Sequence, residues 1–447
     1  MTLISVKRQV GMKRKITRQL ETWKNSDHRK PLVVMGARQV GKTYSVLEFG
    51  RANYAAVLHV DFAEHPDLSR LFSGDVEPDR LVRLLGEYFS TRVDPETTLL
   101  FFDEVQRCPE AITSLKYFCE SAPEYYVIAA GSLLGTTVRQ RAGLFPVGKV
   151  DMITMRPLDF EEYLWALGHE DLADLIREAS WDSRAFALHD RCMELYRRYL
   201  LVGGMPEPLS LWIAQGRMDV VRRTQENIAT GYLADITQYT EGLDGAMVLA
   251  AWRSMPRQLA KDNTKFQYSA IRSGARSKTY APRIEWLKDA GLVEPVTHIT
   301  DAVRPLEAFA EDNNFKLYLL DTGLLSSLYR ARMEDVLPQG DKAAVFRGGL
   351  TENYVCQQLV AAGIKPYYWG VASKSEVEFV FETRGGRVVP VEVKSGKNVG
   401  AKSVRSFADK YEVPYVVKVT AKNFGFENGV RNLPLYAAFT LDEDAEA

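Results

Sequence analysis

A glycine-rich segment near the N-terminus has the residue types and the spacing that hold nucleotide phosphates. Residues 31–43 read PLVVMGARQVGKT. Gly36 and Gly41 let the backbone wrap closely around phosphate, while the loop N–H groups and the N-terminus of the following helix point at the negative charge. Lys42 would reach the β- and γ-phosphates, and Thr43 would place its hydroxyl on Mg²⁺. The segment therefore predicts an ATP site. Its expected contacts are Gly36, Ala37, Arg38, Gln39, Val40, Gly41, Lys42, Thr43 and Tyr44.

An acidic pair supplies the second half of this chemistry. Residues 98–109 read TLLFFDEVQRCP, and the apolar run is typical of a strand buried on both faces. At the carboxyl edge of a parallel sheet, Asp103 would hold the Mg²⁺ shell and Glu104 would polarise the attacking water. Ser132 ends the run YYVIAAGS and could sit beside the γ-phosphate, although an ordinary turn has the same composition. The expected catalytic residues are Glu104, Lys42 and Ser132, and the expected metal ligands are Thr43 and Asp103.

The elements that position these residues follow a strand–helix alternation. Strands are predicted at LVVM, at VLHVDF (residues 57–62), at TLLFF and at YYVIAAGS, with helical stretches between them. Such alternation predicts an α/β fold with a mostly parallel sheet. Further on, RQRAGLFPVGK contains Arg139 and Arg141. Either could act as an arginine finger on a neighbouring subunit, or both could be solvated surface residues.

Several of these segments resemble a prokaryotic family of AAA-type ATPases in which the ATPase core precedes a C-terminal domain of unknown function. The resemblance is carried by GARQVGKT, FFDEVQRCPEAITSLKYF, AGSLL and LFPVGKVDMITMRPLDFEEYL. It extends to LVGGMPEP, FKLYLLDTGLL and GGLTENYVCQQL, followed by VEFVF and VEVKSG. It therefore spans almost the whole chain. It implies the AAA fold, ATP and Mg²⁺ as ligands and a possible homo-oligomeric ring, but it supplies no biological role.

The middle of the chain has helical periodicity over residues 159–240 and resembles the helical lid of AAA-type proteins. Its segments DFEEYLWALGHEDLADLI and MDVVRRTQENIATGYLADITQY begin with an acidic residue or a similar cap, as helices do. Gly203 and Gly204, followed by Pro206, predict a break between two helices.

Residues 252–290 contain many more basic than acidic residues. A predicted helix in APRIEWLKDAGLV leads into VEPVTHI, and FKLYLLD could pair with that strand. Helices followed by a two-stranded hairpin suggest a winged helix, whose basic face would neutralise nucleic-acid phosphates. A structural or protein-docking module with a solvated basic face is the alternative. The candidate nucleic-acid contacts are Arg253, Arg257, Lys261, Lys265, Arg272, Arg276, Lys278 and Arg283.

Close to the C-terminus, VVPVEVKSG (residues 388–396) places Glu392 and Lys394 on one face of a strand. SEVEFVFETRGGR would form the hairpin partner that carries Glu378, and the preceding helix carries Glu352. The arrangement resembles the restriction-endonuclease fold, in which carboxylates bind Mg²⁺ and a lysine assists cleavage. Three interpretations stay open: an active nuclease, a degenerate nuclease-like domain that binds DNA or partners, and a salt-bridged strand pair. Glu378 stands where the usual pattern has Asp, which places cleavage in doubt.

Composition sets outer limits on these interpretations. The chain has 447 residues and a formal net charge of −1, so affinity for nucleic acid must come from local patches. Its four cysteines are not spaced for structural zinc or a disulfide framework. No apolar run is long enough to span a membrane, and the basic N-terminus lacks the apolar core of a signal peptide, so we expect a cytoplasmic protein.

Four domains and three functions follow as expectations. The domains are an ATPase core with a basic N-terminal helix at 1–158, a helical lid at 159–240, a winged-helix-like domain at 241–335 and a nuclease-like domain at 336–447. The favoured function is Mg²⁺-dependent ATP hydrolysis coupled to binding or remodelling of nucleic acid, with DNA as the expected nucleic acid, branched DNA included, and a degenerate nuclease-like C-terminal domain. The alternatives are a nucleotide-driven switch that binds protein partners and a metal-dependent DNA nuclease controlled by ATP.

Overall fold

The computed structural model of the chain describes residues 11–132, 145–182, 184–240, 242–261, 264–336, 344–371, 375–395 and 402–442. These residues form two compact units, one made mainly of residues 13–156 and the other mainly of residues 157–447. We call them the N-terminal unit and the C-terminal unit.

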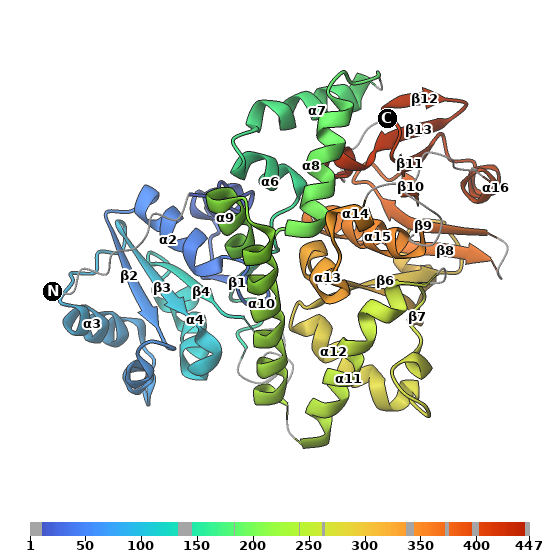
Figure 1. The fold of residues 1–447 in the computed structure, drawn as a ribbon. Coiled ribbons are helices and arrows are strands. Elements are labelled where there is room, and N and C mark those ends of the chain that lie inside the picture. The colour runs from blue at the N-terminus through green and yellow to red at the C-terminus, as the bar shows by residue number, and fades with distance from the viewer. Residues whose placement is uncertain are drawn as a thin grey trace. The chain divides into compact units, whose positions relative to one another are not determined.

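The N-terminal unit is built on a five-stranded sheet in the order β2-β3-β4-β1-β5, and all its pairings are parallel (Figure 1). Every residue of β3 is buried, as its apolar run predicts. The expected α/β fold with a parallel sheet is therefore confirmed. The strands are β1 Leu32–Met35, β2 Ala56–Asp61, β3 Thr98–Asp103, β4 Tyr126–Ala130 and β5 Asp151–Thr154.

Helices connect these strands and cover the sheet. Pro78 and Pro109 occupy the first turns of α3 and α4, where a missing N–H costs nothing. A cluster that includes Phe102, Leu115 and Val127 fills the core where α4 meets the sheet. The helices are α1 Ile16–Lys24, α2 Lys42–Asn53, α3 Pro78–Phe89 and α4 Pro109–Ser121, with short 3₁₀ turns η1 Pro66–Phe72 and η2 Val105–Arg107.

The C-terminal unit begins with helices. Asp159 caps α6 in a capping box with Glu162, as the sequence predicts, whereas α10 begins after Arg217 without a side-chain cap, so the capped start expected there is wrong. Gly203 separates α8 from α9; a Cβ on it would lie 2.4 Å from Asp321 Oδ1, so only glycine fits this crossing. The first helices are α6 Phe160–Ala166, α7 Glu170–Asp182, α8 His189–Val202, α9 Pro206–Gln215 and α10 Met218–Tyr239.

More helices alternate with the strands that follow. They are α11 Gly242–Leu259, α12 Ser277–Asp289, α13 Thr322–Tyr329, α14 Met333–Val336, α15 Ala344–Ala361 and α16 Lys402–Tyr411, with 3₁₀ turns η3 Tyr268–Ala270, η4 Leu306–Phe309 and η6 Leu435–Thr440. Within the residues described, no helix combines the length and the apolar composition that crossing a membrane requires.

A mixed eight-stranded sheet forms the rest of the C-terminal unit, in the order β12-β13-β11-β10-β9-β8-β6-β7. The two expected hairpins, β6–β7 and β9–β10, are both antiparallel pairs. Because β6 also pairs with β8, the sheet is continuous across residue 335, the boundary predicted between the winged-helix-like and nuclease-like domains. The division into four domains and the winged-helix interpretation stay predictions. The strands are β6 Val293–Ile299, β7 Ala310–Leu319, β8 Tyr367–Val371, β9 Ser375–Glu382, β10 Val388–Val393, β11 Val416–Thr420, β12 Gly425–Glu427 and β13 Val430–Pro434.

Candidate functional site

The glycine-rich loop joins β1 to α2 in a conformation that depends on its glycines. Gly36 and Gly41 have φ values of 144° and 99°, which side chains rarely adopt. A Cβ on Gly36 would lie 2.2 Å from the Met155 carbonyl oxygen. Gly41 is the N-cap of α2, so the N-terminus of this helix opens onto the loop. The loop therefore has the backbone that phosphate binding needs.

Lys42 begins α2 and is buried in the loop. Its Nζ donates to the carbonyl oxygens of Gly36 and Ala37 at 2.9 and 2.8 Å. Burial lowers the pKa of Lys42 to about 8, although attraction to Glu104 and Asp103 opposes that shift. A triphosphate would supply the negative charge that keeps this ammonium protonated.

Thr43 and Asp103 meet beside the loop. Thr43 Oγ1 donates to Asp103 Oδ2 at 2.6 Å, and the backbone N–H of Glu104 donates to Asp103 Oδ1 at 2.9 Å. The Asp103 side chain is only 2% exposed. The structure thus brings together the two residues predicted to hold Mg²⁺, and a hydroxyl with a carboxylate is a donor set that this ion accepts.

Glu104 and Ser132 are linked through a residue that the sequence did not single out. Gln106 donates to Glu104 Oε2, and its Nε2 lies 3.3 Å from Ser132 Oγ. Glu104 has a left-handed backbone with φ of 53°, a strained geometry that is common at functional sites. The only sequence signal for Gln106 is its position two residues after the acidic pair. Polar residues are common at such loop positions, so the signal does not single it out.

Arg14 supports the glycine-rich loop at Val40. Val40 is buried, and its carbonyl accepts a hydrogen bond from Arg14 at 2.9 Å. Arg14 also donates to the Arg156 carbonyl at 2.6 Å. It thereby ties the loop to the segment after β5, a role that the sequence did not predict.

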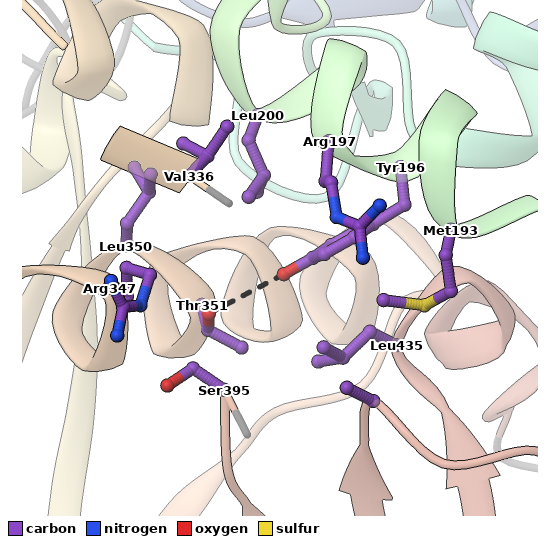
Figure 2. Close-up of a pocket in the computed structure, with 11 residues that line it drawn as sticks. Met193, Tyr196, Arg197, Leu200, Val336, Arg347, Leu350, Thr351, Ser395 and Leu435 are labelled. Carbon is purple, nitrogen blue, oxygen red and sulfur yellow. Dashed lines mark hydrogen bonds between the residues drawn. The ribbon is translucent and has the colours of Figure 1, made fainter. Parts of the chain in front are cut away.

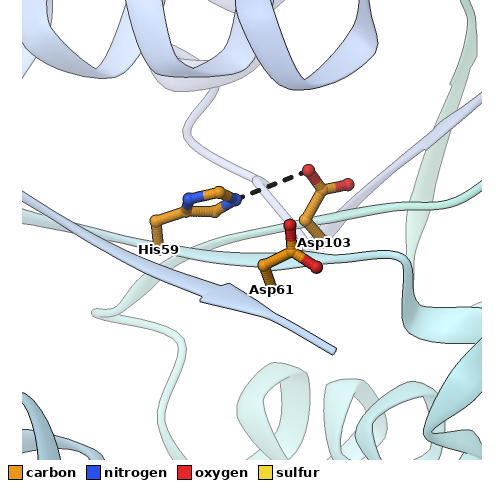
Figure 3. Close-up of side chains that lie close together, drawn as sticks. All are labelled: His59, Asp61 and Asp103. Carbon is orange, nitrogen blue, oxygen red and sulfur yellow. Dashed lines mark hydrogen bonds and ion pairs between the residues drawn. The ribbon is translucent and has the colours of Figure 1, made fainter. Parts of the chain in front are cut away.

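Two further polar side chains stand at the same sheet edge. His59 and Asp61 come from β2, and their ligand atoms and those of Asp103 all lie within 4.8 Å of one another (Figure 3). His59 Nε2 lies 3.4 Å from Asp103 Oδ2. Both residues lie in the strand predicted over residues 57–62, which gave no sign that they approach Asp103. Arg139 and Arg141, the arginine-finger candidates, lie outside the described residues.

In the C-terminal unit, the predicted quartet of Glu352, Glu378, Glu392 and Lys394 does come together. Lys394 Nζ lies 2.5 Å from Glu378 Oε1 and 3.7 Å from Glu392 Oε1. Burial raises the pKa of Glu378, and the charge of Glu352 adds to that shift, while Lys394 opposes it. Burial lowers the pKa of Lys394, but its carboxylate neighbours outweigh burial and raise it.

Two buried lysines that the sequence did not single out complete this group. Lys316 of β7 has a side chain 1% exposed, and its Nζ lies 2.6 Å from Glu376 and 3.8 Å from Glu352. Lys418 of β11 pairs in register with Glu392 and lies 3.6 Å from it. We call the four glutamates and three lysines the C-terminal ion cluster. Its members are Glu352, Glu376, Glu378, Glu392, Lys316, Lys394 and Lys418.

Lysines occupy the interior of this cluster. Burial lowers the pKa of Lys316, but attraction to Glu352 and Glu376 exceeds that effect and raises the pKa above its usual value. Tyr318 and Thr264 donate to Glu352 at 2.8 and 3.1 Å. Among the described residues, the glutamates here do not form a trio at metal-ligand spacing. The carboxylate charge is therefore balanced by the chain itself.

A small pocket opens next to the C-terminal ion cluster. Figure 2 shows Arg197 of α8 and Arg347 of α15 at its edges, with Thr351 and Ser395, the neighbours of Glu352 and Lys394 in the sequence, between them. Tyr196 donates to Thr351 at 3.4 Å. The pocket has a volume of about 30 Å³, which leaves no room for a nucleobase.

The basic segment is mostly solvent-exposed. Arg253 and Arg257 stand one turn apart on α11, so they lie on one face of the helix. Arg283 forms an ion pair with Asp244, and Lys265 lies over the Tyr368 ring at 5.6 Å, so both are partly buried. The exposed candidates are Arg253, Arg257, Lys261, Arg272, Arg276 and Lys278.

Comparison with known families identifies the class of protein. Residues 28–164 match an AAA domain, residues 193–335 match a domain of unknown function (DUF8612), and residues 347–438 match another (DUF4143). The chain therefore carries an AAA-type P-loop ATPase domain, followed by C-terminal domains of unknown function. This confirms the expected combination of an AAA-type ATPase core with a C-terminal domain of unknown function.

Three archaeal proteins are among the solved structures that this chain matches. The Walker-type ATPase paby2304 of Pyrococcus abyssi is 17% identical, over 72% of this chain and 97% of that chain, with a TM-score of 0.46. The ORC2 protein of Aeropyrum pernix is 11% identical over 72% and 94%, with a TM-score of 0.38. Cdc6p of Pyrobaculum aerophilum is 12% identical over 79% and 97%, with a TM-score of 0.28. These TM-scores are too low to carry an argument about function. No curated protein matches the sequence.

Proposed function

We propose that the chain hydrolyses ATP with Mg²⁺ and that hydrolysis is coupled to nucleic-acid binding, with DNA as the first candidate. The observation that carries the ATPase is the 2.6 Å contact between Thr43 and Asp103. It joins the first turn of α2 to the end of β3, beside a loop in which Gly36 and Gly41 have positive φ values. A chance glycine-rich turn would not need a buried carboxylate at that place.

The residues present fit the nucleotide and its metal. Lys42 would hold the β- and γ-phosphates, and its present carbonyl partners would give way to phosphate oxygens. Thr43 and Asp103 would hold Mg²⁺, which supplies charge neutralisation on the phosphates. Glu104 would accept a proton from the attacking water at its carboxylate. Gln106, which already contacts Glu104 and Ser132, would position both.

The exposed arginines of α11 support the nucleic-acid part of the proposal. Arg253 and Arg257 present two guanidinium groups on consecutive turns, and neither is buried by its own unit. Arg272 and Lys278 extend the positive charge along the chain toward α12. Guanidinium groups on a helix face are suited to phosphate contacts, which do not depend on base sequence.

We further propose that the C-terminal ion cluster binds DNA or a partner, or stabilises its own sheet, and does not cleave DNA. Lys316, Lys394 and Lys418 balance the carboxylates that a nuclease would leave for Mg²⁺. With Glu378 in place of the usual Asp, this favours the degenerate nuclease-like interpretation. Incubation of plasmid and junction DNA with Mg²⁺ or Mn²⁺ tests it. Cleavage by the wild-type chain that disappears in Lys394→Ala would contradict it.

The coupled function is tested by ATP turnover in the presence of single-stranded, duplex and junction DNA. We expect stimulation by at least one DNA form, DNA affinity that falls steeply with salt, and no turnover in Lys42→Ala. Gel mobility shifts with ATP, with ADP and without nucleotide show which state binds DNA. Turnover that ignores all DNA forms, with no shift in any state, would instead favour a nucleotide-driven switch for protein partners. Assembly into a homo-oligomeric ring stays a prediction.

A further inference from the structure

His59 stands where the metal of the nucleotide site would be held. It lies two residues before Asp61 on β2, so the two side chains share one face of the sheet. The parallel register places His59 opposite Phe101 and Asp61 opposite Asp103. Strand geometry therefore gathers one imidazole and two carboxylates at the carboxyl edge, beside Thr43 (Figure 3).

The side chains in this group are held in place. The His59 ring stacks on Phe101 with centroids 4.9 Å apart and an interplanar angle of 13°, which fixes the ring plane. Asp61 Oδ1 accepts the backbone N–H groups of Ala63 and Glu64 at 2.7 and 3.1 Å. Asp103 Oδ2 lies between Thr43 and His59, at 2.6 and 3.4 Å. Ligands about 2.1 Å from one ion lie roughly 3–4 Å apart, so the side chains would need only small shifts.

We propose that His59 is a ligand of the divalent cation at the nucleotide site and that the site therefore takes a first-row transition-metal dication, such as Mn²⁺ or Co²⁺, more readily than most P-loop sites do. The inference rests on the proposed ATPase function and deepens it. Mg²⁺ prefers oxygen ligands and gains little from an imidazole, whereas transition-metal dications accept nitrogen and oxygen together. His59 would thus bias the choice of metal without taking part in proton transfer.

Pulsed electron paramagnetic resonance of Mn²⁺ bound to the full chain with ADP tests the proposal directly. An imidazole ligand adds a nitrogen modulation to the Mn²⁺ signal. We expect this modulation in the wild type and in the control His65→Gln, and we expect its loss in His59→Gln. Adenine nitrogens give the same background in all three proteins. A wild-type complex that binds Mn²⁺ and ADP without the modulation would overturn the proposal and leave the ATPase function standing.

Metal affinity gives a second readout. Titration of the ADP complex with Mn²⁺ and with Mg²⁺ yields the ratio of the two affinities. Removing even a hydrogen-bond partner of a ligand typically lowers metal affinity by about 10–100-fold, so we expect loss of the His59 ligand in His59→Gln to reduce the Mn²⁺/Mg²⁺ affinity ratio by about tenfold or more. An unchanged ratio would mean that His59 only orients Asp103. If the wild type binds neither ADP nor Mn²⁺, the proposed ATPase function fails and this proposal fails with it.

Discussion

The chain carries two clusters of acidic side chains on sheets, and they balance their charge in opposite ways. At the edge of the N-terminal sheet, Asp61 and Asp103 lie beside His59, and the ammonium of Lys42 is held by loop carbonyls. In the C-terminal unit, three lysines lie among four glutamates. Buried charges are usually paired or bound to a metal, which applies to Asp103 in the first cluster and to Glu392 in the second. In the proposed function the first cluster receives a metal ion, whereas the second cluster already contains its own lysine cations.

This difference separates two roles that similar residues can have. A site that awaits an ion can change state when the ion and its nucleotide bind or leave. A site that is neutralised by lysines is fixed, and its polar groups specify how the strands that carry them pair. The difference between the two clusters is best tested by substitutions that remove the acidic group thought to act at the first cluster or the lysine that neutralises the second.

Glu104→Gln should have the largest effect. The amide cannot accept a proton, so we expect ATP hydrolysis to fall by about 10²–10⁴-fold while ATP binding persists. Single-turnover hydrolysis and calorimetric titration measure the two quantities. The matched control is Glu110→Gln, an exposed glutamate on α4 that should leave both unchanged. Normal turnover in Glu104→Gln would show that another group activates the water.

Lys316→Met should have the next largest effect. Removing a buried ammonium leaves Glu352 and Glu376 without their cation, and breaking such a pair costs about 3–5 kcal/mol of unfolding free energy. We expect Mn²⁺ or Ca²⁺ to restore part of the loss, because the vacated place is surrounded by carboxylates. Denaturant unfolding followed by tryptophan fluorescence measures the cost.

Lys365→Met is the matched control for that experiment. Lys365 and Glu307 are also 2.6 Å apart, but both side chains are 64% exposed, so the pair should contribute about 0–1 kcal/mol. Equal losses in the two variants, or no response of Lys316→Met to divalent cations, would contradict the view that Lys316 stands in for an ion.

Features of the fold and of the sites could be predicted from the sequence when their residues lie close together in the chain. The glycine loop, Lys42 and Thr43 form one segment, and a buried strand that ends in Asp103 is visible in its apolar run. Glu392 and Lys394 could be found because alternation along a strand fixes which side chains share a face, and the resemblance to the restriction-endonuclease fold added Glu352 and Glu378. These predictions needed only local periodicity and a known motif.

The features that were missed depend on pairing between distant segments. His59 becomes a candidate ligand only when β2 lies beside β3 in a definite register. Lys316 sits in the apolar run FKLYLLD, which reads as plain core until β7 and α15 bring Glu352 to it. The pairing of β6 with β8 likewise joins residues some seventy positions apart. No local pattern encodes such pairings, because alternative registers would satisfy the same alternation.

A smaller effect is expected from the exposed arginines of α11. Each phosphate contact contributes about 0.9 to the slope of log affinity against log salt concentration on duplex DNA. If both arginines touch phosphate, Arg253→Gln with Arg257→Gln should lower the slope by about 1.8 and weaken binding evenly across DNA sequences. Fluorescence anisotropy at several salt concentrations measures it. The control is Arg332→Gln, whose side chain is 80% exposed and ion-paired with Glu334 at 3.6 Å. An unchanged slope would show that α11 does not contact the phosphates. It would not affect the conclusions about the metal chemistry of the two clusters.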